Sequence, residues 1–315
     1  MLNIYSLQDG ALVETSIVCF EQLKENALWV NLTTPTEDER QWVRDAYEQE
    51  LTTTELMEEI EASSRFYEDE QGLHLHAYFL KSVGDRVVNV TVGFTLNQNR
   101  IFTLTPEDLP VFTDFAQLLK RTPSRVNLPF SILLGLFETE IDRLADLLER
   151  LYKEVSQYDK AFFSSGQKDL ENILMHIASI EEMNGRARLN LIDEQRTLSS
   201  LLRSGKLSEK QQVRLSEMLR DIDSLLSHSA ALFEKVKFLM DVIMGKINIE
   251  QNKIIKIFSI AAVVFLPPTL VASVYGMNFE FMPELSWELG YPFAILLMVT
   301  SGIAPYWLFK RKGWL

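Results

Sequence analysis

The stretch IFSIAAVVFLPPTLVASVYGMN, residues 257–278, decides the fold of this 315-residue chain. Its first nineteen residues, Ile257–Tyr275, carry no charge, and a second uncharged run of nineteen residues occupies Tyr291–Phe309. As a helix, each run spans about 28 Å, close to the thickness of the hydrocarbon core of a bilayer. The sequence therefore predicts two transmembrane helices joined by an outer loop, 276–290.

The charges around these runs predict their orientation. The loop contains three glutamates, including Glu280 and Glu284, and no Lys or Arg. Basic residues flank the ends of the runs that lie away from the loop. They are Lys253 and Lys256 before the first run, and Lys310, Arg311 and Lys312 in the tail, 310–315. Because basic flanks stay on the cytoplasmic side, we expect both termini in the cytoplasm. The two glutamates then face outward, where they attract cations.

The rest of the chain is acidic. The whole sequence has 31 Lys and Arg, 44 Asp and Glu, and a net charge of −13, although the hairpin and its flanks are slightly basic. An acidic surface argues against nucleic acid as a partner and is compatible with divalent cations or with plain solubility. The single cysteine, Cys19, excludes an intramolecular disulfide and a cysteine-rich metal site. The N-terminus does not read as a signal peptide.

Residues 1–125 have the pattern of an α/β domain that lies in the cytoplasm. Strands are predicted at Leu28–Leu32, Leu73–Lys81, Val87–Leu96 and Arg100–Leu104, and helices are predicted to begin at Thr36, Thr54 and Glu107. His74 and His76 lie two residues apart and so share one face of a strand. A zinc pair is one interpretation, but no third ligand is near in sequence, which favours a polar sheet face.

Residues 126–256 are predicted to form a helical stalk. No proline occurs between Pro129 and Pro267, and apolar residues recur at helical spacing from Leu133 to Val155. The breaks predict helices at 129–163, 168–203 and 207–275. The last would be roughly 100 Å long and must pack against neighbours to be stable. The fold class is thus an α+β membrane protein with an α/β domain, a helical stalk and a C-terminal two-helix hairpin.

One weakly polar stripe follows the first transmembrane segment. Its members, from the outer end inward, are Ser273, Thr269, Leu266, Ala262, Phe258 and Ile255. Two interpretations remain open: the hydroxyls bond to their own backbone, or the stripe lines a pore. One hairpin cannot enclose a pore, so the second interpretation requires several copies around the first helix.

Three motifs together resemble one known family. Tyr-Gly-Met-Asn at 275–278, Met-Pro-Glu-Leu at 282–285 and the basic tail after the second run are similar to the CorA magnesium and cobalt transporters over the full length. The resemblance implies a homopentamer in a bacterial inner membrane, with the first transmembrane helices around one pore. Gly276, Met277 and Asn278 would form the selectivity filter, with five amide oxygens at the outer mouth.

The resemblance also implies regulation by internal Mg²⁺. Met57–Ile60 resembles the segment of the family that carries a regulatory carboxylate, which points to Glu59. The acidic stretch Arg220–Asp223 in the stalk offers Asp221 and Asp223 as its counterparts. Magnesium bridging these carboxylates between neighbouring subunits would hold the pore closed, and its loss would leave repelling charges.

Mg²⁺ suits a neutral filter because it dehydrates reluctantly and keeps several waters. Amide oxygens can accept hydrogen bonds from a hydrated ion without trapping it. The membrane potential can drive uptake, since a divalent ion gains roughly 4.6 kcal/mol across 100 mV. The chain lacks a Gly-x-x-x-x-Gly-Lys-Ser/Thr loop and a nucleophile–base set, so neither an ATP-driven pump nor an enzyme is expected, and no organic cofactor.

The Mg²⁺ channel is also expected to pass Co²⁺ and Ni²⁺, and two alternatives to it stay open. A zinc exporter of the same superfamily would share the architecture, but such relatives tend to carry another residue in place of Met277. A membrane-tethered coiled-coil scaffold would explain the stalk and hairpin, but it does not explain an acidic outer loop behind Gly-Met-Asn.

Overall fold

The computed structural model describes residues 1–8, 11–52, 65–84, 86–121, 128–164, 170–278, 280 and 282–313. The chain divides into two compact units, Met1–Leu239 and Met240–Leu315. The first unit holds a mixed sheet and long helices, and the second holds a helical hairpin. This architecture confirms the fold class predicted from the sequence.

The first unit is built on a seven-stranded sheet with the order β2-β1-β3-β7-β6-β5-β4. The strands are β1 (Leu2–Gln8), β2 (Ala11–Ile17), β3 (Ala27–Thr33), β4 (Phe66–Asp69), β5 (Gly72–Val83), β6 (Arg86–Leu96) and β7 (Ile101–Thr105). Strands β3 and β7 pair in parallel, with Trp29 opposite Ile101, and the other pairs are antiparallel. The four predicted strands are confirmed, whereas β1, β2 and β4 were not predicted.

Helix α1 (Glu37–Tyr47) begins where the sequence predicts, because Thr36 closes a capping box. The Thr36 hydroxyl accepts a hydrogen bond from the Glu39 N–H at 3.2 Å, and the Glu39 carboxylate accepts one from the Thr36 N–H at 2.9 Å. These two bonds satisfy N–H groups that would otherwise lack partners in the first turn. The helix start predicted at Thr54 lies outside the described residues.

The helix predicted from Glu107 begins later, at Pro110, and forms α4 (Pro110–Arg121). The reason is local: the Thr105 hydroxyl donates to the Glu107 carbonyl and accepts from the Glu107 N–H, which holds these residues in a turn. Proline is well suited to the first helical position because it lacks an N–H that needs a partner there. A short 3₁₀ helix, η1 (Phe20–Gln22), precedes β3.

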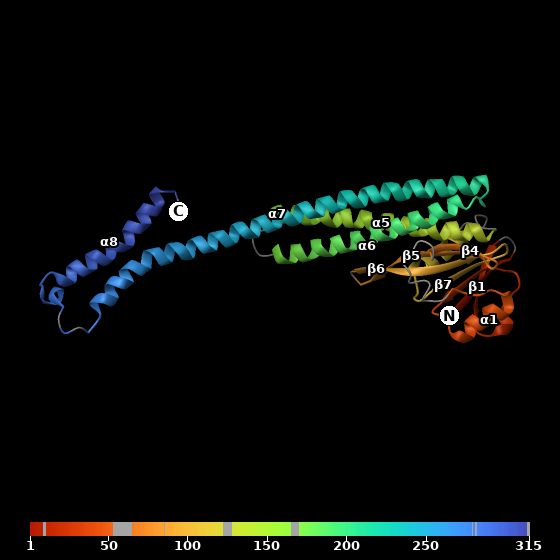
Figure 1. Cartoon of the computed structure of the whole chain (residues 1–315), viewed down its shortest axis with the longest axis horizontal. Helices are drawn as coiled ribbons and strands as arrows, with labels where there is room; N and C mark the ends of the chain where they lie inside the picture. The colour runs from red at the N-terminus through yellow and green to blue at the C-terminus, as the bar shows by residue number, and fades with distance from the viewer. Residues whose placement is uncertain are drawn as a thin grey trace. The chain divides into compact units, whose positions relative to one another are not determined.

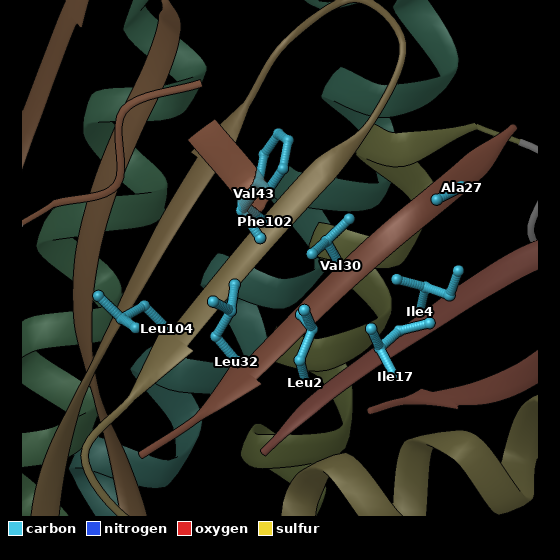
Figure 2. Packing of buried hydrophobic residues seen from close by; sticks show 9 residues of the cluster. All are labelled: Leu2, Ile4, Ile17, Ala27, Val30, Leu32, Val43, Phe102 and Leu104. Atoms are coloured by element: carbon cyan, nitrogen blue, oxygen red, sulfur yellow. The ribbon is translucent and has the colours of Figure 1, made fainter. Parts of the chain in front are cut away.

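The sheet buries apolar side chains on both faces. On the α1 side, Figure 2 shows a cluster of Leu2, Ile4, Ile17, Ala27, Val30, Leu32, Val43, Phe102 and Leu104. On the other side, Trp29 packs against Phe112 and Phe115 of α4, with ring centroids 6.1 and 5.8 Å apart. Burial of these large rings supplies much of the stability of the unit.

Three long helices follow: α5 (Pro129–Ser164), α6 (Leu170–Arg203) and α7 (Glu209–Tyr275). Their bounds confirm the three predicted helices to within two residues. Polar pairs join the helices inside the first unit. In a buried pair, Asn184 of α6 donates to the Ser229 carbonyl of α7 at 3.1 Å, and the Ser229 hydroxyl donates back to the Asn184 amide oxygen at 2.9 Å.

The second unit consists of the end of α7, a 3₁₀ turn η4 (Pro283–Ser286) and α8 (Gly290–Arg311). Both helices are long and apolar enough to cross a membrane. Pro267 and Pro268 lie within α7 without ending it. Each removes one N–H donor, and α8 packs against this part of α7 through Gly302.

Candidate ion pathway and regulatory residues

The predicted pore stripe occupies the face of α7 that α8 leaves uncovered. All six members of the stripe are exposed, from Ile255 to Ser273. Residues on the other side of the helix, such as Ala261, Val264 and Pro268, are partly covered, and they line the contact region with α8. The hairpin therefore presents the stripe as a free surface along its full length.

The stripe changes character along its length. Phe258 is 71% exposed and Leu266 is 65% exposed, so the inner and middle parts present bulky apolar side chains. Toward the outer end, the Thr269 hydroxyl donates to the Phe265 carbonyl at 2.7 Å. This bond agrees with the interpretation that the hydroxyl satisfies its own backbone, yet the Thr269 oxygen keeps lone pairs that can accept from a water molecule.

The Gly-Met-Asn segment continues directly from the last turn of α7. The Gly276 N–H donates to the Ala272 carbonyl at 2.9 Å, and the Met277 N–H donates to the Val274 carbonyl at 3.3 Å. A Cβ at Gly276 would lie 3.0 Å from the Ala272 carbonyl oxygen, so a side chain here would strain this close turn. Met277 and Asn278 follow as exposed residues, and Met277 is 50% exposed.

The outer loop is held by its own backbone. The Trp287 N–H donates to the Glu284 carbonyl, and the Gly290 N–H donates to the Trp287 carbonyl. A Cβ at Gly290 would lie only 2.3 Å from the Glu284 carbonyl oxygen, so this position requires glycine. Glu280 and Glu284 of this loop are exposed, so their carboxylates can act on cations in solution.

The regulatory candidates fall on different sides of α7. Asp221 lines a cleft of about 260 Å³ with Glu138, Asp142 and Glu217, and Arg214 of the same cleft donates to both carboxylate oxygens of Glu138. Asp223 instead accepts a hydrogen bond from the Gln195 amide of α6. The two aspartates therefore do not converge, and Glu59 lies outside the described residues.

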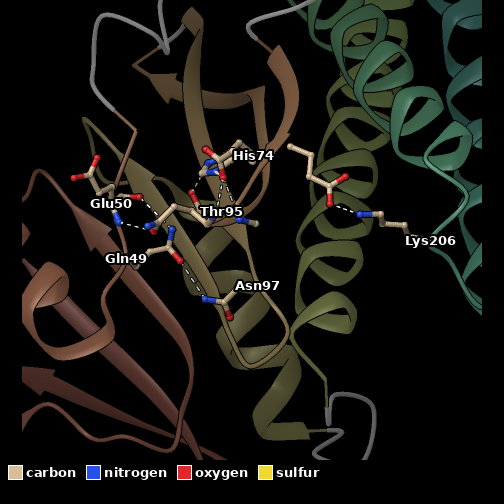
Figure 3. Close-up of polar contacts among 10 residues, drawn as sticks. Gln49, Glu50, His74, Thr95, Asn97 and Lys206 are labelled. Carbon is tan, nitrogen blue, oxygen red and sulfur yellow. Dashed lines mark hydrogen bonds and ion pairs between the residues drawn. The ribbon is translucent and has the colours of Figure 1, made fainter.

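The two sheet histidines form a buried polar layer. His74 and His76 are 3% and 0% exposed. His74 Nδ1 lies 3.1 Å from the Thr95 hydroxyl and its Nε2 lies 2.9 Å from the Asp69 carboxylate (Figure 3). In the same region Asn97 donates to Gln49. Within the part of the chain that the structure describes, no three His, Cys, Asp or Glu side chains are grouped to hold a metal ion.

Comparison with known proteins identifies the family. Residues 24–311 match the family described as CorA-like Mg²⁺ transporter protein. The chain is also 46% identical over 318 residues to the magnesium transport protein CorA of Escherichia coli K12, and the match covers 100% of both chains. The chain belongs to the CorA-like Mg²⁺ transporter family. The resemblance drawn from Tyr275–Asn278 and Met282–Leu285 is thereby confirmed.

Solved structures share the fold of this CorA-like chain. The complete CorA magnesium transporter of Methanocaldococcus jannaschii matches with a TM-score of 0.78 at 18% identity, covering 100% of this chain and 99% of that one. The cytoplasmic domain of ZntB from Vibrio parahaemolyticus matches with a TM-score of 0.59 at 12% identity, covering 78% of this chain and 97% of that one. At these identities the likeness concerns the fold alone.

Sequence reasoning missed a group of buried carboxyls between the sheet and the long helices. Glu140 of α5 and Glu194 of α6 are both 0% exposed. Burial raises the pKa of Glu140 to about 7, although the Leu80 N–H of β5 donates to its carboxylate. Burial, with Glu140 and Asp193 nearby, raises the pKa of Glu194 well above its usual value. The signal was present: Glu140 interrupts the apolar row between Phe137 and Leu144.

Proposed function

We propose that this chain is a homopentameric channel for passive Mg²⁺ uptake, driven by the membrane potential and closed by intracellular Mg²⁺. The chain is a member of a Mg²⁺ transporter family, and a relative with 46% identity over its whole length is named as a magnesium transport protein. Family membership also speaks against an enzyme. The channel mechanism, the passage of Co²⁺ and Ni²⁺ and the five-fold assembly are parts of the proposal.

The uncovered stripe of α7 is the observation that carries the channel mechanism. A transmembrane helix that packs against α8 on one side and exposes a weakly polar row on the other is suited to assembly around an axis. We place Ser273 and Thr269 toward the outer end of the pore and Phe258 and Ile255 at its inner, apolar part. Hydrophobic constrictions of this kind gate by excluding water.

The mouth is the proposed site of selection. Asn278 is exposed at the end of the close turn that Gly276 permits. A ring of its amide oxygens would accept hydrogen bonds from the waters of a hydrated Mg²⁺. Met277 is a soft ligand and is proposed to pack rather than to bind the hard ion. Both termini are placed in the cytoplasm of a bacterial cell, with the hairpin in its inner membrane.

Closure is proposed to depend on Mg²⁺ bound by carboxylates of the cytoplasmic part, with Asp221 as the leading candidate. It lines a cleft with three further acidic side chains, and the cleft opens to solvent. Asp223 is a weaker candidate for the Mg²⁺ ligand, because its carboxylate already accepts a hydrogen bond from Gln195. Glu59 stays a candidate on sequence grounds alone.

Flux into proteoliposomes tests the proposal. The full-length protein is reconstituted with an internal magnesium dye, an inside-negative potential is imposed, and Asn278→Ala is compared with wild type. Asn172→Ala, an exposed asparagine of α6, serves as the matched substitution away from the hairpin. Potential-dependent influx that is lost only in Asn278→Ala supports the proposal. Normal influx through Asn278→Ala would overturn the filter assignment, and larger zinc flux would favour a zinc transporter.

A further inference from the structure

An apolar groove of about 680 Å³ runs between α7 and α8 in the second unit. Helix α7 contributes a row from Ile257 to Pro268, and α8 contributes a row from Met298 to Tyr306. The Tyr306 hydroxyl is the single polar side-chain group in this lining. Such a groove is suited to hydrocarbon rather than to a polar ligand.

The groove opens on a different face from the proposed pore. At about 100° per residue, the row Ile257, Ile260, Val264 and Pro268 is centred roughly 160° around α7 from the stripe that ends at Ser273. In an assembly built around the stripe, this groove therefore faces outward, toward lipid. This step rests on the pore face assigned under the proposed function.

The length of the groove favours one acyl chain as its occupant. From Ile257 to Pro268 the helix rises about 16 Å, which is half of a hydrocarbon core of about 30 Å. One lipid chain spans one leaflet, so the dimensions agree. A transmembrane helix of a second copy would need contacts along the full thickness of the core.

Both apolar rows end in a lysine at the same end of the groove. Lys253 lies one turn before Ile257 on α7, and Lys310 lies one turn after Tyr306 on α8, so each shares the face of its row. Both lysines are exposed. The Lys253 ammonium donates to the Glu250 carboxylate, which lies one turn earlier on α7, at 2.9 Å. The surrounding flanks carry three more basic residues, which leaves this end positive.

We propose that the groove binds an acyl chain of an anionic phospholipid of the inner leaflet, whose phosphate is held between Lys253 and Lys310. Basic side chains at the cytoplasmic edge of a membrane attract anionic headgroups, and the apolar rows fix where the chain enters. The bound chain would fill the space beside Pro268 and Gly302, where the two helices pack closely. Lipid composition would then influence the hairpin.

Lipid binding to the full-length protein in mild detergent tests this site by native mass spectrometry. The probes are phosphatidylglycerol and phosphatidylcholine with identical oleoyl chains. Wild type is expected to prefer phosphatidylglycerol, and Lys253→Gln with Lys310→Gln is expected to weaken its binding roughly thirtyfold. Arg311→Gln removes the same kind of charge off the groove face, where Arg311 lies over the Trp307 ring, and should keep the preference.

A second variant tests the groove itself. Ala261→Phe would fill it and should reduce binding of both lipids, and Ala261→Leu should do so less. Equal binding of the two lipids by wild type, or a preference that survives loss of both lysines, would overturn the proposal. A change in oligomeric state with unchanged lipid binding in Ala261→Phe would assign the groove to a second copy. Because no flux is measured, this result is separate from the outcome of the transport assay.

Discussion

Gly302 of α8 packs directly against the backbone of Val264 in α7. A Cβ at Gly302 would lie 3.2 Å from the Val264 carbonyl oxygen and 3.3 Å from the Pro268 ring. Pro268 is four residues after Val264 and has no N–H to donate to that carbonyl. The glycine therefore lets α8 close over the part of α7 where the helical hydrogen bonding is interrupted.

Enlarging Gly302 should open the hairpin. Gly302→Leu is expected to lower the thermal midpoint of the full-length protein in detergent, while Gly302→Ala should have a smaller effect. Overpacking of this kind costs about 1–3 kcal/mol. Gly185→Ala, in α6 with nothing within 4 Å of an added Cβ, is the control and should be neutral or stabilising. Equal midpoints for wild type and Gly302→Leu would contradict the close packing.

The buried carboxyls predict that stability falls as pH rises. The pKa of Glu140 is raised from 4.5 to about 7, so between these values the folded chain holds a proton that the unfolded chain has lost. The free energy of unfolding should therefore decrease by about 3 kcal/mol from pH 4.5 to pH 7 through this group. Burial also raises the pKa of Glu194 well above its usual value, so this group contributes a decrease of the same sign.

Neutral isosteres isolate this effect. Glu140→Gln keeps an oxygen for the Leu80 N–H and the Asn190 amide, and removes the charge. It should leave the free energy of unfolding nearly unchanged at pH 4 and raise it at pH 8, in denaturation of the full-length protein in detergent. Glu194→Gln should do the same. A loss of stability of equal size at both pH values would show that the pKa of the carboxyl does not differ between the folded and unfolded chain.

The sequence predicted elements whose signals are local. Nineteen-residue apolar runs, the capping residue Thr36 and helical spacing in the stalk can each be recognised within one continuous stretch of sequence. Strand β1 was not predicted because it is stabilised by its pairing with β2 and β3, and no local sequence pattern reveals this pairing. The stripe of α7 was predicted from spacing, but only packing shows that α8 leaves it uncovered. The buried partners of Glu140, Leu80 of β5 and Asn190 of α6, are 60 and 50 residues away in sequence and could not be derived locally.

Arg65 and Asp193 form an ion pair that should be costly to break. Arg65 Nη1 lies 2.7 and 2.8 Å from the two carboxylate oxygens of Asp193, and the side chains are 3% and 6% exposed. Asp193 also accepts from the Tyr78 N–H. Arg65→Met leaves a buried carboxylate without its counter-charge, so the free energy of unfolding should fall by about 3–5 kcal/mol.

The pair between Lys206 and Glu68 provides the comparison, because its side chains are 63% and 44% exposed. Lys206→Met should change the free energy of unfolding by less than about 1 kcal/mol. Denaturation of the full-length variants in the same detergent measures both values. Similar decreases in the free energy of unfolding for the two variants would mean that burial does not determine how much an ion pair contributes to stability.

The outer glutamates should affect capture of the ion rather than its passage. Glu280 and Glu284 are exposed in the loop that follows the proposed mouth at Asn278. Glu280→Gln with Glu284→Gln is expected to lower Mg²⁺ influx at low Mg²⁺ and low ionic strength, with little change at saturating Mg²⁺. The difference should disappear at high salt, because the Debye length then shrinks to about 3 Å at 1 M. A reduced maximal rate at every salt concentration would instead place these side chains in the conduction path.

Asp221 and Asp223 should differ in their effect on closure, since only Asp221 lines the acidic cleft. Asp221→Asn is expected to raise the internal Mg²⁺ concentration for half closure roughly fivefold, as for loss of about 1 kcal/mol from a solvent-exposed ion contact. Asp223→Asn can still accept the hydrogen bond from Gln195 and should change it little. Proteoliposomes loaded with increasing internal Mg²⁺ report the midpoint of closure. A Mg²⁺ ion bound at the cleft would make the midpoint respond to Asp221→Asn alone. Equal shifts of the midpoint in the two variants would instead indicate that closure depends on the total surface charge.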